Sequence, residues 1–151
     1  MIRPAAAIPP ALLLAACSDA APPSDGGPDL VTDEGGITRP FAGIAADEVV
    51  SFGGTEPFWS VTLSGDTATY RTPELPAGEA IAVTRFAGRG GVSWTGEYAG
   101  RRFALTATPG LCSDGMSDRT YPYFTLAEVD GRTLEGCAHT DRQPFTGPAA
   151  P

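Results

Sequence analysis

Short β-prone runs separated by turn residues occupy most of the chain after residue 40. Gly, Pro or Asp-Gly signals interrupt the sequence about every ten residues, and no window keeps an apolar repeat of 3.6 residues over three turns. This spacing predicts about eight strands joined in sequence. The expected strands are residues 48–52, 58–63, 68–72, 80–86, 92–98, 102–108, 123–129 and 132–138.

Such a chain is expected to be all-β, a small antiparallel meander that closes into a barrel, because closure removes exposed sheet edges. Alternation places Trp59, Val61 and Leu63 on one face of their strand. Residues 130–131, Asp-Gly, are the strongest hairpin signal. Gly96 and Gly136, inside strand patterns, are expected to be bends or bulges.

Two further turn signals are expected to end strands. Gly-Gly at residues 53–54 follows the first run, and Pro-Gly at residues 109–110 follows the sixth.

The length of 151 residues, 42% of them hydrophobic, allows one core with tails. We expect a signal peptide at 1–16, a lipidated Cys17 with a flexible acidic tether at 17–40, a β-barrel domain at 41–139, and a disordered tail at 140–151. The tether and tail are rich in Gly, Pro and polar residues, which bury too little apolar surface to offset the entropy of ordering.

The N-terminus combines Arg3, a short apolar stretch, and an apolar residue with two alanines before Cys17. This pattern resembles bacterial lipoprotein signals, which implies that Cys17 is diacylated, palmitate included, and becomes the new N-terminus. Ser18 in the next position implies the periplasmic face of the outer membrane. A disordered leader on a cytosolic protein remains the alternative, because three prolines interrupt the apolar stretch.

The formal net charge is −8, with arginine supplying all ten basic residues. An acidic surface argues against binding nucleic acid or an anionic bilayer through a basic patch, and it suits a basic partner. We expect a monomer.

With Cys17 lipidated, Cys112 and Cys137 remain as one pair in an oxidising compartment, and we expect a disulfide. The chain has no C-x-x-C pair for redox work and no zinc-ligand spacing. A bridge closing a loop of roughly 26 residues would contribute about 3 to 4 kcal/mol in the chain-entropy model.

Residues 112–123 contain a cysteine, two Ser-Asp pairs, a glycine and a Tyr-Pro-Tyr sequence. Reactive, polar and turn-forming residues are more concentrated here than in the rest of the chain. They can form a turn cluster in which Ser and Asp cap backbone N–H groups and Gly115 takes a positive φ. They can also form a recognition loop held rigid by the disulfide, which lowers the entropy lost on binding. The candidate binding residues here are Ser113, Asp114, Met116, Ser117, Asp118 and Tyr121.

The second compact motif is Gly-Thr-Glu-Pro-Phe-Trp at residues 54–59. Pro57 restricts Glu56 to extended geometry, so Phe58 and Trp59 enter their strand at a defined angle. The aromatic pair is expected either to plug one end of the barrel or to form a binding rim with Glu56.

These two motifs resemble an uncharacterised family of bacterial envelope lipoproteins. The resemblance also includes Tyr-x-Thr-Pro at 70–73, Pro-Gly at 109–110, Tyr-Pro at 121–122 and Gly-Cys-Ala at 136–138. The resemblance covers about residues 51–138. More loosely, the architecture is similar to META-type domains and to membrane-bound inhibitors of c-type lysozyme. It implies a small envelope β domain without an established activity.

The expected function is an outer-membrane-anchored binding or structural module. Inhibition of a basic lysozyme is the alternative, and a hydrolase using Ser113 or Ser117 with His139 is the third hypothesis. We expect no enzymatic activity, cofactor or metal, because the two loop aspartates lack the ligand spacing of an EF-hand and no apolar pocket for a glycosidase acid can be identified.

Overall fold

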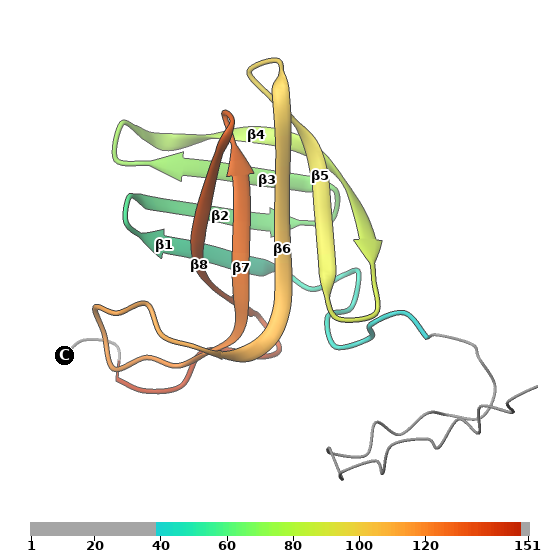
Figure 1. Cartoon of the computed structure of the whole chain (residues 1–151), viewed down its shortest axis with the longest axis vertical. Coiled ribbons are helices and arrows are strands. Elements are labelled where there is room, and N and C mark those ends of the chain that lie inside the picture. Colours follow the sequence, from blue (N-terminus) through green and yellow to red (C-terminus); the bar gives the residue numbers. More distant parts are fainter. Residues whose placement is uncertain (1–38, 149–151) are drawn as a thin grey trace, which may run out of the picture. The chain divides into compact units, whose positions relative to one another are not determined.

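The computed structural model describes residues 39–148, which form an antiparallel meander of strands (Figure 1). Each strand pairs with the next, and β1 also pairs with β8, so the sheet closes into a barrel. The expected all-β barrel is confirmed. The strands are β1 (Val50–Thr55), β2 (Phe58–Ser64), β3 (Thr67–Thr72), β4 (Leu75–Ala87), β5 (Val92–Tyr98), β6 (Arg101–Cys112), β7 (Tyr121–Val129) and β8 (Arg132–Thr140).

The predicted signal peptide, the predicted lipidation site Cys17 and the predicted tether up to residue 38 lie outside the described residues, as do residues 149–151. Within 39–148, no helix is long and apolar enough to cross a membrane.

The strand alternation fills the barrel interior. Trp59, Val61 and Leu63 are buried, as their pattern predicted, and the intervening residues of β2 are exposed. Trp94 and Phe103 are among the largest fully buried side chains. Burying side chains of this size contributes about 1.5–3 kcal/mol each, so the packed interior is the main source of stability.

Two strands run past the glycines and proline that were expected to end them. β1 continues through Gly53 and Gly54, and β6 continues through Pro109 to Cys112. Gly54 is tolerated because the buried Trp59 indole occupies the place of its missing side chain. Pro109 precedes a shift in the β6–β7 register, where a missing N–H interrupts little pairing.

Of the expected bends or bulges at Gly96 and Gly136, bulges are excluded. Both residues pair in register with their neighbouring strands, and the register shifts lie elsewhere. A Cβ on Gly96 would meet the Ala82 carbonyl oxygen, and one on Gly136 would meet the Gly53 carbonyl oxygen. These glycines therefore allow close approach of adjacent strand backbones.

The two ends of the barrel differ. The turns β1–β2, β3–β4, β5–β6 and β7–β8 lie at one end, here named the hairpin end; Asp130 and Gly131 both adopt a positive φ there. At the opposite end, the segment preceding β1 closes the interior. Ile44 is fully buried, Phe41 N donates to Gly88 O at 2.7 Å, and an arginine from β4 donates to Ile44 O.

The expected disordered tail from residue 140 is corrected for residues 140–148. Thr140 is buried at the end of β8, and Thr120 and Thr146 exchange two backbone hydrogen bonds of 2.9 Å. Phe145 packs edge-on against His139, with 5.2 Å between the ring centroids. The Gly, Pro and polar composition of residues 140–148 predicted disorder, but Phe145 anchors the segment through its contact with His139.

The closeness of β1 to the Trp59 indole gives a direct stability test. A Cβ on Gly54 would meet the indole nitrogen and the Glu135 carbonyl oxygen, whereas the nearest atom to a Cβ on Gly53 is the Trp59 carbonyl oxygen at 3.6 Å, an ordinary contact. We predict that Gly54→Ala lowers the free energy of unfolding by about 1–3 kcal/mol. Urea denaturation of Gly53→Ala, the matched control, is expected to show little change or a small gain, and equal losses in both variants would contradict the account.

Candidate functional site

The disulfide between Cys112 and Cys137 is confirmed, with 5.6 Å between the Cα atoms. Cys112 belongs to β6 and Cys137 to β8, and β7 lies between these strands. Alternate strands in a sheet are about 9–10 Å apart, so the end of β6 must bend across β7 to make the bond. The bend coincides with the β6–β7 register shift, where Gly110 lies against the Phe124 ring without room for a side chain.

Asp114 organises the loop between β6 and β7. One carboxylate oxygen accepts hydrogen bonds from the N–H groups of Met116 and Ser117, at 3.0 and 2.8 Å. The other accepts from the hydroxyls of Ser117 and Tyr121, at 2.8 and 3.2 Å. The Met116 N–H is the largest of several causes that lower the pKa of Asp114 to about 2, because hydrogen bonding favours the charged form while burial opposes it.

Further bonds tie this loop to itself and to the barrel. Ser113 Oγ accepts from Gly115 N at 3.2 Å, and Gly115 has a φ of 70°. The Thr55 hydroxyl donates to the Asp114 carbonyl oxygen at 3.2 Å, which joins the loop to the end of β1. The turn-cluster interpretation is thus confirmed for Asp114, Ser113 and Gly115, and the same bonds give the loop a fixed shape.

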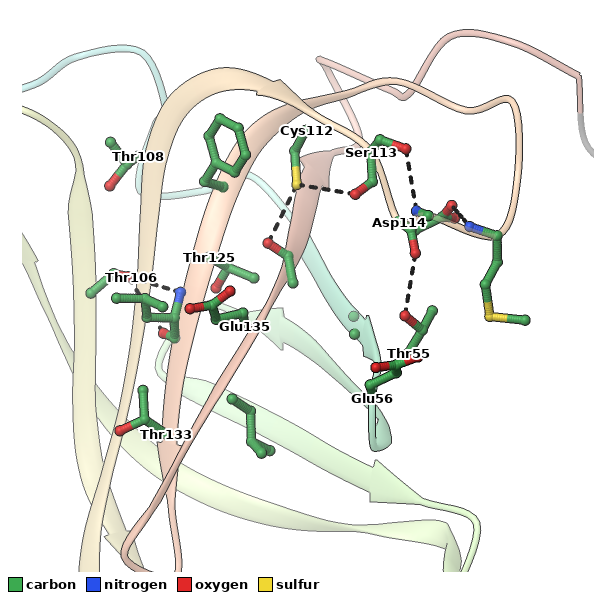
Figure 2. Close-up of a pocket in the computed structure, with 18 residues that line it drawn as sticks. Thr55, Glu56, Thr106, Thr108, Cys112, Ser113, Asp114, Thr125, Thr133 and Glu135 are labelled. Carbon is green, nitrogen blue, oxygen red and sulfur yellow. Dashed lines mark hydrogen bonds between the residues drawn. The ribbon is translucent and has the colours of Figure 1, made fainter.

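A groove of about 920 Å³ lies on the outer face of β6, β7 and β8, beside this loop (Figure 2). The loop and the end of β1 form one wall, and the threonine-rich outer face of β6 contributes the other side. We name it the outer groove. It is lined by Gly53, Gly54, Thr55, Glu56, Thr106, Thr108, Cys112, Ser113, Asp114, Gly115, Met116, Phe124, Thr125, Leu126, Thr133, Leu134, Glu135 and Gly136.

The groove combines exposed apolar side chains with negative charge. Met116, Phe124 and Leu126 are 61%, 50% and 49% exposed, which is unusual for large apolar groups. The charged lining residues are Glu56, Glu135 and the Asp114 carboxylate, and no arginine or histidine of residues 39–148 lines the groove.

The structure brings only some of the predicted binding residues together. Ser113, Asp114, Met116 and Glu56 line the outer groove. The others do not line it.

Ser117 and Tyr121 support the loop by bonding to Asp114. Asp118 is exposed at the loop surface, Phe58 is exposed at the hairpin end, and Trp59 is buried, with its indole N–H directed at the Glu135 carbonyl oxygen at 3.4 Å. The end-plug hypothesis therefore holds for Trp59 and fails for Phe58.

Sequence reasoning missed Phe124 and Leu126, which face outward from β7. Their signal was present: residues 123–127 are apolar or β-branched at every position, so both faces of the strand carry apolar groups. A strand of this kind in a small barrel buries one face and leaves the other exposed.

His139 packs against the Tyr121 ring, with 5.9 Å between the ring centroids. It shares a cavity of about 220 Å³ with Asp114 and Tyr121. Burial, helped by the charge of Arg119, lowers the pKa of His139. Within residues 39–148, no hydrogen bond joins His139 to Ser113 or Ser117.

The described residues also contain no cluster of three His, Cys, Asp or Glu side chains that could hold a metal ion. Comparison of the chain with known protein families, with curated proteins and with solved structures finds no match.

The Asp114 bonds predict a pH-dependent contribution to stability. The folded pKa lies below the ordinary value of 3.8, so the contribution is present above about pH 4 and is lost as the pH falls toward 2. We expect Asp114→Asn to lower the free energy of unfolding by about 1–2 kcal/mol at pH 7, and the gap to wild type to narrow between pH 4 and 2.

Urea unfolding at a series of pH values checks this prediction. Asp118→Asn is the matched control, because the Asp118 carboxylate accepts no hydrogen bond from a described residue and is exposed. A gap that stays constant down to pH 2 would show that the Asp114 charge is not responsible.

Proposed function

We propose that this protein is a lipid-anchored binding module of the bacterial envelope, and that the outer groove is its recognition site. The single observation that carries the proposal is the preformed groove beside the disulfide-linked loop. Three exposed apolar side chains sit in a hollow whose wall is fixed by the Cys112–Cys137 bond and the Asp114 hydrogen bonds. A preorganised site loses little entropy on binding.

The partner is a basic protein or peptide. Glu56 and Glu135 offer acceptors at the groove, and no basic side chain from the described part of the chain lines it. The overall charge of −8 would steer a basic partner toward the protein. The apolar side chains would supply contact area, while the acidic groups select the sign of the partner's charge.

Inhibition of a basic lysozyme is the second candidate, favoured by the same acidic lining. The inhibitor role differs from simple binding because it requires the bound lysozyme to lose its activity. A lysozyme assay with the purified domain distinguishes the two, because inhibition relieved by Glu135→Arg supports the inhibitor role, whereas full lysozyme activity with wild type present excludes it.

The membrane anchor rests on the N-terminal sequence alone. We predict that Cys17→Ala shifts the protein from the membrane fraction to the soluble fraction, because the acyl chains attached through this residue supply the membrane affinity. Fractionation of cells that express wild type and variant checks this. Retention of the variant in membranes would contradict the anchor.

The groove proposal is tested by charge reversal. Envelope proteins cross-linked to the purified barrel domain are expected to include a basic partner whose capture falls at least about tenfold with Glu135→Arg, equal to a loss of about 1.4 kcal/mol. Glu97→Arg is the matched control, because Glu97 is an exposed strand carboxylate that does not line the groove.

Capture should also weaken as salt is raised, and more steeply for wild type than for Glu135→Arg. Equal capture by wild type and Glu135→Arg would show that the groove does not bind the partner. An equal loss of capture with Glu97→Arg would show the same.

A further inference from the structure

The hairpin end of the barrel opens into a separate hollow of about 650 Å³. Its rim comes from the β1–β2, β3–β4 and β7–β8 hairpins, and the buried side chains of Val129 and Leu134 lie beneath it. The volume is within the range of about 300–1,000 Å³ that holds small ligands, and barrel mouths are common places for them. Six of its lining residues are here called the barrel mouth: Phe58, Tyr70, Glu74, Glu79, Tyr98 and Arg132.

Tyr70 is the deepest polar group of this hollow. Its side chain is only 8% exposed, and its ring is held edge-on by Tyr98 at 5.5 Å and by Phe103 at 6.4 Å between centroids. Yet the Tyr70 hydroxyl has no hydrogen-bond partner among the described residues. Because this oxygen is not fully buried, it is accessible from the hollow and can hydrogen-bond a ligand there.

Charges of both signs surround this hydroxyl. Burial raises the pKa of Tyr70, Tyr98, Glu74 and Asp130 add to the rise, and Arg132 opposes it. Asp130 is already paired with an arginine of β6 at 3.1 Å.

Arg132, Glu74 and Glu79, in contrast, form no ion pair with a described residue. The mouth thus offers one unpaired guanidinium, two unpaired carboxylates and an unpaired phenol hydroxyl. A guanidinium and a hydroxyl are donors that suit a carboxylate, and carboxylates and aromatic faces suit an ammonium group.

We propose that the barrel mouth binds a small zwitterion that carries one ammonium and one carboxylate group, the chemistry of a free amino acid. Arg132 and the Tyr70 hydroxyl hold the carboxylate. Glu74 and Glu79 hold the ammonium, and the rings of Phe58 and Tyr98 border the rest of the ligand. A ligand of a single charge would leave one of these sets unmatched. None of the six residues lines the outer groove, although Thr55 and Leu134 border both hollows, so the two sites use different polar and aromatic groups.

The test titrates free amino acids singly into the barrel domain and follows binding by calorimetry. At least one is expected to bind with a Kd at or below about 10 mM. Its amide, which lacks the carboxylate, and its N-acetyl derivative, which lacks the ammonium, are expected to bind at least about tenfold more weakly.

Two variants link the binding to the mouth. Tyr70→Phe keeps the buried ring and is expected to weaken binding about threefold to tenfold, the effect of one hydrogen bond. Arg132→Gln is expected to remove the preference for the free amino acid over its amide. Glu135→Gln in the outer groove is the control and is expected to bind like wild type.

The proposal is overturned if no amino acid binds at 10 mM, if the amide binds as tightly as the free acid, or if Tyr70→Phe and Arg132→Gln both bind like wild type. Loss of binding in Glu135→Gln with the mouth variants unaffected would also overturn it, because the ligand would then occupy the groove. Partner capture through the groove is measured separately, so either result can fail without the other.

Discussion

The bond between Cys112 and Cys137 joins two strands that the barrel keeps apart. Since β7 lies between β6 and β8, the bond requires β6 to leave the barrel surface and bend over its neighbour. That bend positions the loop that follows and leaves the outward side chains of β7 at the base of a groove. Past Pro109, the described β6–β7 pairing continues only at Cys112 and Tyr121, so the bond adds the main constraint on this part of β6.

The loop shape depends on a second, electrostatic constraint. A single carboxylate, that of Asp114, accepts four hydrogen bonds from within the loop and from Tyr121. Its negative charge strengthens each bond, and the bonds in turn keep it ionised. Asp114 therefore serves the site by ordering it, while Met116, Glu56 and Glu135 are the groups left accessible to a partner.

The fold could be predicted from the sequence because its signals are local. Alternation in β2 and the Asp-Gly pair at 130–131 each act over a few residues, and both predicted their elements correctly. The errors concern contacts between distant residues. Gly54 does not end β1, since its neighbour is the Trp59 indole, and the C-terminal segment is ordered because Phe145 meets His139.

The proposed sites show the same division between local sequence signals and contacts between distant residues. Loop chemistry at residues 113–117 is local and was recognised, whereas the groove and the barrel mouth are assembled from several hairpins each. Phe124 could be flagged as an apolar residue on a strand with two apolar faces, but its position opposite Met116 depends on the disulfide. Tyr70 stands out in the sequence only as part of the Tyr-x-Thr-Pro motif at 70–73, and its unpaired hydroxyl becomes visible only once its surroundings are known.

Amide hydrogen exchange of the oxidised and reduced domain, followed segment by segment, tests the central claim that the disulfide holds the loop and groove in place. The account predicts that reduction accelerates exchange in residues 110–121 at least about tenfold more than in β2 to β5, which keep their pairing without the bond. Acceleration that is uniform across all strands, or absent from 110–121, would show that the bond stabilises the barrel generally and does not shape the groove.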